Sequence, residues 1–301
     1  MVTRTPHRPV AGIAWMLLTG LCFISVTALV KYMGTRIPPA ESAFLRYMMG
    51  LVFLLPAIGA LREARLTQRQ WKIFGLRGFM HGIGVILWFY AMARIPIADV
   101  TAMNYLAPIY VTIGAALFLG ERLAFRRIAA VLAALLGAFL ILRPGFREVS
   151  TGHLAMLGTA IAFGGSYLTA KILADEVKPA VVVALLSVVV TVVLAPFALM
   201  NWVTPTLPEL GLLFAVACFA TAGHYTMTLA FAAAPLTVTQ PVTLTQLIWA
   251  VLLGYLVFDE AVDIWVVLGG LVIVGSVVFI TLREAALKRG ETTPPVHATK
   301  G

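Results

Sequence analysis

The sequence predicts an all-α integral membrane protein whose ten transmembrane helices form two inverted five-helix repeats. Composition, the length of the apolar runs and a recurring spacing between the two halves lead to this prediction. Of the 301 residues, 61% are hydrophobic and 12% are charged, whereas soluble domains carry about 45–50% apolar and about 25% charged residues. A soluble chain with so few charges could not cover its own surface, so we expect lipid to be its solvent.

The apolar runs have the length of membrane-spanning helices. Each continues for about 20 residues, enough to cross a hydrocarbon core of about 30 Å, without the alternation over roughly ten residues that is typical of membrane β-strands. Prolines stand at several breaks between the runs and favour helix ends there. We expect helices near residues 10–33, 40–60, 72–93, 97–120, 123–142, 152–174, 179–202, 207–233, 236–258 and 262–283.

A near-constant spacing relates the two halves of the chain. The matching pairs are Gly12/Gly152, Lys31/Lys171 and Pro56/Pro196 at an offset of 140, and Pro96/Pro235 and Glu121/Glu260 at an offset of 139. Because the matches are spread over most of the helices, duplication explains them better than chance does. Each half then holds five helices, and an odd number inverts the second copy relative to the first, as in many secondary transporters.

The repeats divide the chain into five segments. We expect an N-terminal cytoplasmic tail at 1–9, a first repeat at 10–143, an extracytoplasmic linker at 144–151, a second repeat at 152–283 and a C-terminal cytoplasmic tail at 284–301.

Lysine and arginine are distributed unequally between the two ends of the helices. One end carries Arg4, Arg8, Arg62, Arg65, Arg69, Lys72, Arg122, Arg126, Arg127, Lys171, Lys178, Arg283, Lys288, Arg289 and Lys300, and the other carries Lys31, Arg36, Arg94, Arg143 and Arg147. Positive residues collect on the cytoplasmic side of membrane proteins. We therefore expect a multi-pass protein of the bacterial cytoplasmic (inner) membrane with both termini in the cytoplasm.

Several partner classes are disfavoured. The net charge of +9 is spread between hydrophobic runs instead of forming the single patch that nucleic acid requires. Cys22 and Cys218 lie inside apolar runs and form no metal-ligand spacing. We expect no metal, no cofactor, no nucleic acid and no obligatory protein partner, which leaves a small-molecule substrate and the lipid bilayer.

Six segments carry a family resemblance. They are ALVKYM (28–33), FLRYMMGLVFLLP (44–56), ARIPIADVTAMNYLAPIYV (93–111), LGERL (119–123), QLIWAVLLGYLVFDE (246–260) and FDEAVD (258–263). Together they resemble the EamA-type branch of the drug/metabolite transporter superfamily, and the likeness extends over about residues 10–283. Asp259 departs from the family pattern, because it stands where Gly120 stands in the first half.

The resemblance implies a ten-helix inverted repeat around a central cavity. Helices one, three, four, six, eight and nine would line that cavity for the most part. The implied cargo is an amino acid or a derivative, a vitamin such as riboflavin, S-adenosylmethionine, an opine-type metal chelator or a drug.

Polar and aromatic side chains within the spans are the candidate substrate contacts, because polar groups are costly in lipid. The candidates are His81, Trp88, Asn104, Tyr105, Pro108, Tyr167, His224, Tyr225, Gln240, Thr243, Gln246 and Trp249. His81 and His224 lie one helical turn apart under the repeat, and histidine can bind an anionic group or relay a proton. Hydrogen bonding between helices is the alternative role for all of these polar groups.

Charged residues near the span ends suggest ion pairs. Arg46 lies just beyond Glu41 in the same helix, so we expect them to pair, with outward snorkelling of Arg46 or anion binding by it as the alternatives. Glu121 and Glu260 occupy short turns, where they would cap a helix or hold an ion pair at a gate. None of the 13 acidic residues lies at the centre of a span, so a carboxylate relay for protons or sodium is not supported.

The function predicted from these features is secondary, non-ATP transport of a small amphipathic metabolite across the inner membrane by alternating access, with export slightly favoured. No G-x-x-x-x-G-K-[ST] loop is present for ATP. A channel-like or assembly subunit is one alternative. A membrane-embedded, histidine-dependent enzyme is a weaker one, because no H-E-x-x-H or similar constellation supports it, and we expect no enzyme activity.

Overall fold

The computed structural model describes residues 8–118, 120, 125–174 and 176–292 of the chain. This part of the chain forms helices and no strand, apart from one isolated bridge between Pro144 and Arg147. The first half contains α1 (Pro9–Met33), α2 (Pro39–Gly50), the 3-10 helix η1 (Leu51–Ala57), α3 (Ile58–Glu63), α4 (Gln68–Met92), α5 (Ile97–Asn104), α6 (Ala107–Phe118) and α7 (Phe125–Leu142). The second half contains α8 (Thr151–Ala174), α9 (Pro179–Met200), α10 (Leu207–Ala233), α11 (Leu236–Val242), α12 (Leu244–Phe258) and α13 (Ile264–Thr292).

The helix ends follow local sequence rules. Thr67 caps the start of α4 with a capping box. Its hydroxyl accepts from the N–H of Gln70, and Gln70 Oε1 accepts from the N–H of Thr67. Prolines occupy the first turns of α1, α2, α9 and α10, where a missing N–H costs nothing. Asp259 ends α12 in the left-handed region at φ 53°, close to the 67° of Gly120. The departure from glycine in this turn therefore keeps a positive φ, which aspartate tolerates better than most residues.

The predicted all-α membrane fold is confirmed. Within the described ranges, eight helices are long and apolar enough to cross a membrane. The segments not among them are α8, with 24 residues, and the short pair α11–α12, whose second member is an apolar helix of 15 residues. The count of ten membrane crossings therefore stays a prediction. The structure also extends α13 to Thr292, so the beginning of the predicted tail at 284–301 is helical.

Equivalent helices of the two halves pack in equivalent ways. α1 lies against α10, and α4 lies against α8. A Cβ atom on Gly12 would overlap the Cβ of Ala234, and one on Gly152 would overlap the side chain of Ile95. Ala234 and Ile95 are themselves 139 residues apart, so both close contacts obey the spacing between the repeats.

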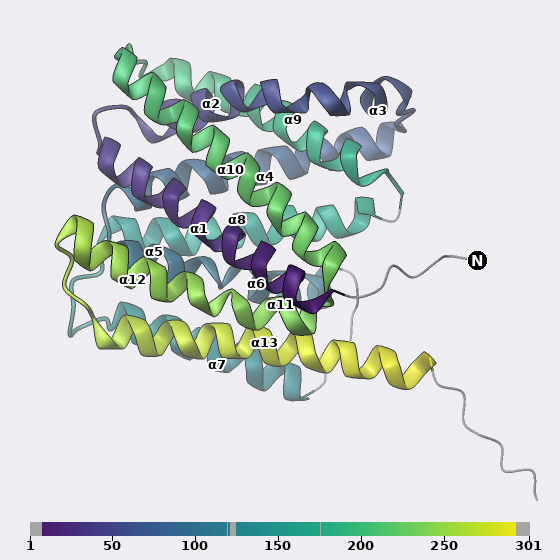
Figure 1. Ribbon diagram of the computed structural model, residues 1–301, viewed down its shortest axis with the longest axis vertical. Coiled ribbons are helices and arrows are strands. Elements are labelled where there is room, and N and C mark those ends of the chain that lie inside the picture. The colour runs from purple at the N-terminus through teal and green to yellow at the C-terminus, as the bar shows by residue number, and fades with distance from the viewer. Residues whose placement is uncertain (1–7, 119, 121–124, 175, 293–301) are drawn as a thin grey trace, which may run out of the picture.

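The two halves also run in opposite directions. In Figure 1, α1 runs from right to left and α8 runs from left to right, while the first turn of α1 and the last turn of α13 lie at the same end of the bundle. α7 and α13 pack at Gly137 and Gly269, and a Cβ on either glycine would overlap the carbonyl of the other. Glycine is required here because the two backbones touch.

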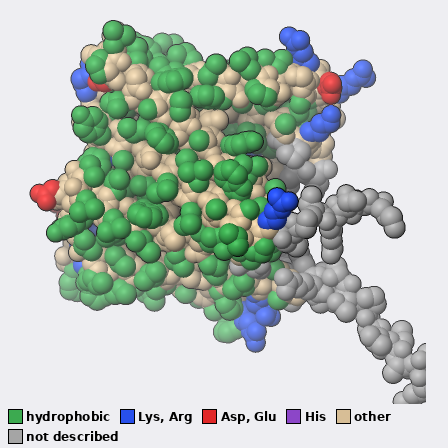
Figure 2. Space-filling view, in the orientation of Figure 1, with side chains coloured by type: hydrophobic (Ala, Val, Ile, Leu, Met, Phe, Trp, Pro, Cys, Tyr) green, Lys and Arg blue, Asp and Glu red, His purple; other side chains and the backbone are tan. Residues whose placement is uncertain are grey.

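The surface agrees with a membrane environment. Figure 2 shows a face that is mostly hydrophobic, with its lysine, arginine, aspartate and glutamate side chains near the ends of the helices. Large apolar side chains are exposed between those ends, including Leu132, Phe139, Val192 and Leu256. Lipid tails would cover such a surface at no cost in polar contacts.

Candidate substrate site

Two interrupted helices, one from each repeat, meet through Tyr105. The break between α5 and α6 follows Asn104, and the break between α11 and α12 falls at Thr243. The Tyr105 hydroxyl donates to the carbonyl of Thr243 at 2.7 Å and lies 3.4 Å from Gln246 Oε1. The sequence-predicted residues Tyr105, Thr243 and Gln246 therefore lie together where both helices are broken.

Two predicted contacts have buried polar atoms without a described partner. These atoms are Trp88 Nε1, a donor on α4, and Asn104 Oδ1, an acceptor at the end of α5. The Trp88 ring packs edge-on against Phe163 with 6.2 Å between ring centroids. A buried polar atom that lacks its hydrogen bond costs about 1–3 kcal/mol, so each atom is suited to a polar group of a ligand or to water.

His81 lies in a contact between helices. It is 6% exposed, its Nε2 lies 2.9 Å from Tyr47 Oη on α2, and its Nδ1 lies 3.3 Å from Ser166 Oγ on α8. Its ring stacks on Phe163 at 4.9 Å. Both ring nitrogens are engaged in this conformation, which is the arrangement expected of a histidine that joins helices.

The other predicted aromatic and histidine residues are more accessible. Tyr167, Tyr225 and Trp249 are 43%, 66% and 41% exposed. His224 on α10 is also exposed, and its ring meets that of Phe23 edge-on at 5.2 Å. The structure does not gather these residues into one contact with Tyr105. The side chain of Gln240 lies outside the described residues.

A cavity of about 380 Å³ lies beside the first helix break. Pro108 and Tyr167, both predicted site residues, line it together with Thr112, Arg127 and Thr281. These residues belong to α6, α8, α7 and α13. The participation of α7 and α13 differs from the family expectation, which places neither helix around the central cavity.

The predicted ion pair between Glu41 and Arg46 is not formed. Glu41 Oε2 accepts from the backbone N–H of Val203 at 2.8 Å, and the Arg46 guanidinium lies 4.0 Å from the centre of the Tyr47 ring. Residues five apart point about 140° away from each other around a helix. The sequence prediction overlooked this separation.

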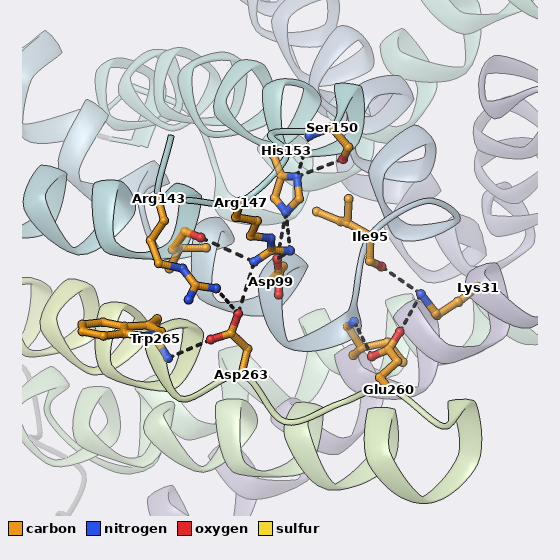
Figure 3. Close-up of polar contacts among 12 residues, drawn as sticks. Lys31, Ile95, Asp99, Arg143, Arg147, Ser150, His153, Glu260, Asp263 and Trp265 are labelled. Atoms are coloured by element: carbon orange, nitrogen blue, oxygen red, sulfur yellow. Dashed lines mark hydrogen bonds and ion pairs between the residues drawn. The ribbon is translucent and has the colours of Figure 1, made fainter. Parts of the chain in front are cut away.

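A polar network closes the end of the bundle that is predicted to be extracytoplasmic (Figure 3). Lys31 Nζ lies 2.6 Å from Glu260 Oε1, and their side chains are only 17% and 13% exposed. Lys31 also donates to the carbonyl of Ile95 at 2.8 Å, and Glu260 Oε2 accepts from the N–H of Ile97 at 2.9 Å. Glu260 therefore fills both roles expected of it: it pairs with Lys31, and it caps the start of α5 through the N–H of Ile97.

The second part of this network is built around Asp99. Its Oδ2 atom lies 2.5 Å from Arg147 Nη2 and 2.8 Å from His153 Nε2. Arg143 pairs with Asp263 at the start of α13. Asp99 and His153 are 1% and 3% exposed, so lipid and water scarcely reach the Asp99 carboxylate at this end of the bundle.

The opposite end carries looser contacts among the residues that are described there. Arg69 Nη1 lies 2.7 Å from Glu176 Oε1, with side chains 63% and 33% exposed. This hydrogen bond, with another from Gln70, holds the pKa of Glu176 below its ordinary value. Lys178 lies 3.5 Å from Glu63, and both side chains are more than two-thirds exposed. Exposed ion pairs of this kind contribute little to the stability of the fold.

Sequence reasoning missed the Asp99 cluster, together with Arg77 and Tyr47. Arg147 and His153 stand 48 and 54 residues from Asp99 along the chain, and no spacing rule links them. The available signal was Asp99 itself, an acidic residue at the edge of an apolar run that needed a basic partner.

The comparisons with known proteins agree with this architecture. The model of the EamA-like transporter family matches residues 10–143 and again residues 150–282. The chain belongs to this family. It is therefore a multi-pass membrane protein with two repeated halves, related to transporters of the drug/metabolite type.

The EamA relatives are transporters of small molecules. The chain is 31% identical to a riboflavin transporter of Vibrio cholerae, over 95% of this chain and 97% of the relative. It is 27% identical to an S-adenosylmethionine uptake transporter of Rickettsia bellii, over 91% and 94%. It is 29% identical to a pseudopaline exporter of Pseudomonas aeruginosa, over 88% and 93%. These names indicate transporters and not enzymes.

A solved structure supports the same fold. It is described only as a crystal structure of a protein, aligns with a TM-score of 0.59 at 21% identity, and covers 91% of this chain and 96% of its own. At this identity the likeness concerns the fold alone.

Proposed function

We propose that this EamA-family protein is a secondary carrier that moves a small amphipathic metabolite across the bacterial inner membrane by alternating access. The observation that carries the proposal is the contact between two broken helices, in which Tyr105 Oη and Thr243 O are 2.7 Å apart. Many secondary carriers hold their substrates at broken helices between two repeats.

Two polar atoms support a substrate site here. Trp88 Nε1 and Asn104 Oδ1 are buried and lack a described partner. A substrate with both an acceptor and a donor would satisfy the two atoms. The Trp88 ring adds an aromatic surface, against which a planar molecule can stack. An amino-acid derivative or a vitamin like riboflavin has these properties.

The ion pairs are more buried at one end of the bundle than at the other, which supports alternating access. Lys31–Glu260 and the Asp99 cluster close the end that carries fewer positive residues in the sequence, which is extracytoplasmic under the positive-inside rule. Exposed pairs such as Lys178–Glu63 join the other end. We propose that the described conformation is closed toward the outside, with both termini in the cytoplasm.

The named relatives include one protein for uptake and one for export. The proposal therefore concerns the carrier mechanism and not the direction of net flow. Riboflavin is the first cargo to test, because the sequence matches to the two riboflavin transporters extend over nearly the whole chain.

Counterflow in proteoliposomes tests the carrier mechanism. Vesicles loaded with unlabelled riboflavin should accumulate labelled riboflavin transiently, and the initial rate should saturate as the external concentration rises. A channel-like protein would give flux that rises linearly and shows no transient accumulation. Empty vesicles and vesicles with the Tyr105→Phe variant provide the comparison, since Phe keeps the ring and removes the bond to Thr243.

A further inference from the structure

Two buried arginines within the membrane-spanning helices lack an acidic partner. Arg46 on α2 is 9% exposed and Arg77 on α4 is 6% exposed. Neither forms an ion pair with any carboxylate in the described part of the chain. The carboxylates that do form ion pairs there have other partners: Lys31, Arg36, Arg69, Arg143, Arg147, His153 and Lys178.

Most hydrogen-bond donors of the two guanidinium groups have no partner among the described residues. Arg77 Nη1 donates to the carbonyl of Val182 at 3.0 Å, while Arg77 Nε is buried without a described partner. Arg46 lies over the Tyr47 ring at 4.0 Å and makes no hydrogen bond with the described residues. Each guanidinium has five N–H donors in a planar fork, so together they offer several donors for an incoming acceptor.

The two arginines are linked through Tyr47 and His81. The Tyr47 ring carries the Arg46 guanidinium, and the Tyr47 hydroxyl lies 2.9 Å from His81 Nε2. His81 and Arg77 stand one turn apart on the same side of α4. We call Arg46 and Arg77 the basic cluster; it comes from α2 and α4.

An aromatic surface adjoins the basic cluster. Phe163 on α8 stacks on His81 at 4.9 Å, meets Trp88 at 6.2 Å and lies 6.1 Å from the ring of Tyr167. Positive charge and ring faces therefore stand next to each other inside the bundle.

We propose that the basic cluster binds an anionic group of the substrate, a carboxylate or a phosphate, while the apolar part of the same molecule lies against Phe163 and Trp88. Uncompensated arginines in a membrane span are costly and mark substrate pathways. The planar fork of arginine matches both carboxylate and phosphate oxygens. The proposal rests on the carrier function and narrows its cargo to an amphipathic anion.

Matched pairs of ligands test the charge preference directly. The first pair is riboflavin and riboflavin 5′-phosphate, and the second is N-acetylphenylalanine amide and N-acetylphenylalanine. Binding to purified protein is measured by flavin fluorescence quenching and by thermal shift. For at least one pair, the wild-type protein should bind the anionic member about tenfold more tightly than the neutral one. The pair that responds distinguishes phosphate from carboxylate.

Variants then locate the preference. Arg46→Gln and Arg77→Gln should each reduce the preference for the anion to less than about twofold, whereas Arg46→Lys should keep part of it because the charge remains. Arg62→Gln is the matched control, since Arg62 is an exposed arginine of α3. It should leave the preference unchanged.

The proposal is overturned if wild-type protein binds the neutral member of both pairs as tightly as the anionic member, or binds none of the four ligands. It is also overturned if folded Arg46→Gln protein keeps the full preference. Counterflow distinguishes this failure from failure of the carrier function. Saturable riboflavin counterflow without anion preference would contradict the anion site alone. Tight anion binding without counterflow would contradict the carrier function alone.

Discussion

Lys31 and Glu260 form an ion pair across the two repeats, with Nζ and Oε1 2.6 Å apart. Lys31 lies in the last turn of α1, and Glu260 lies in the turn before α13. Through Ile97 N–H, Glu260 also holds the first turn of α5. The three helices therefore meet at one carboxylate, and a carrier that opens at this end must separate them.

Breaking this pair is expected to slow transport. Lys31→Gln or Glu260→Gln leaves a partly buried charge unpaired, and we expect the initial rate of flavin counterflow to fall by roughly tenfold, which corresponds to about 1.4 kcal/mol. The measurement is the initial rate in proteoliposomes with equal amounts of protein. Lys178→Gln is the control, because the pair of Lys178 with Glu63 is exposed; it should change the rate by less than about twofold. Equal losses in the buried and exposed pairs would contradict the role of the Lys31–Glu260 contact.

The close contacts between equivalent helices predict strong glycine requirements. Gly12→Val and Gly152→Val should each destabilise the protein by about 1–3 kcal/mol, because the added side chain overlaps Ala234 or Ile95. Thermal unfolding in detergent measures the loss. Gly75→Ala is the control: no atom lies within 4 Å of the added Cβ, so it should be neutral or stabilising by up to about 1 kcal/mol. Similar melting temperatures for all three variants would show that the halves do not pack as described.

The bond from Tyr105 to Thr243 should stabilise the two helix breaks. Tyr105→Phe removes the hydroxyl and is expected to lower the free energy of unfolding by about 0.5–1.5 kcal/mol. Tyr32→Phe serves as the comparison, because Tyr32 is 74% exposed and should change stability by less than about 0.5 kcal/mol. If the two variants unfold alike in chemical denaturation, the contact between the breaks does not contribute to stability.

The contact between Glu176 and Arg69 predicts a dependence on pH. Hydrogen bonds from Arg69 and Gln70 hold the pKa of Glu176 below its ordinary value of 4.5. Because the folded pKa is the lower one, the contact stabilises the folded protein above the unfolded pKa and is lost as the pH falls through the folded pKa. The difference in melting temperature between wild type and Glu176→Gln should therefore be constant near neutral pH and shrink below about pH 4.5. A melting-temperature difference that grows on acidification would contradict a stabilising contact between Glu176 and Arg69.

Periodic and punctuated features of the fold were predictable from the sequence. Pro96 and Pro235 mark the starts of the interrupted helices, and the repeat spacing in the sequence links Gly12 to Gly152, which make equivalent close contacts. Tyr105, Thr243 and Gln246 were predicted because polar groups inside apolar runs need partners, and the structure brings them together.

Contacts between distant segments could not be predicted in the same way. Asp99 finds Arg147 and His153 only after α5, α7 and α8 have packed. The Glu41–Arg46 prediction failed because closeness in sequence was taken for closeness around a helix. Arg77 lies within an apolar run of the sequence, and its burial without an acidic partner appears only in three dimensions.

The half-saturating concentration of flavin counterflow tests most directly whether a carrier substrate site lies at these helices. Trp88→Phe and Asn104→Ala remove the two buried polar atoms that lack a described partner, while Trp71→Phe makes the same aromatic change at an exposed position of α4. With riboflavin and its 5′-phosphate as test substrates, we expect Trp88→Phe and Asn104→Ala to raise this concentration by roughly tenfold, the effect of one lost hydrogen bond of about 1.4 kcal/mol, and Trp71→Phe to leave it unchanged. Equal values for all three variants and wild type, or the absence of saturable counterflow with either flavin, would contradict a carrier with its substrate site at these residues.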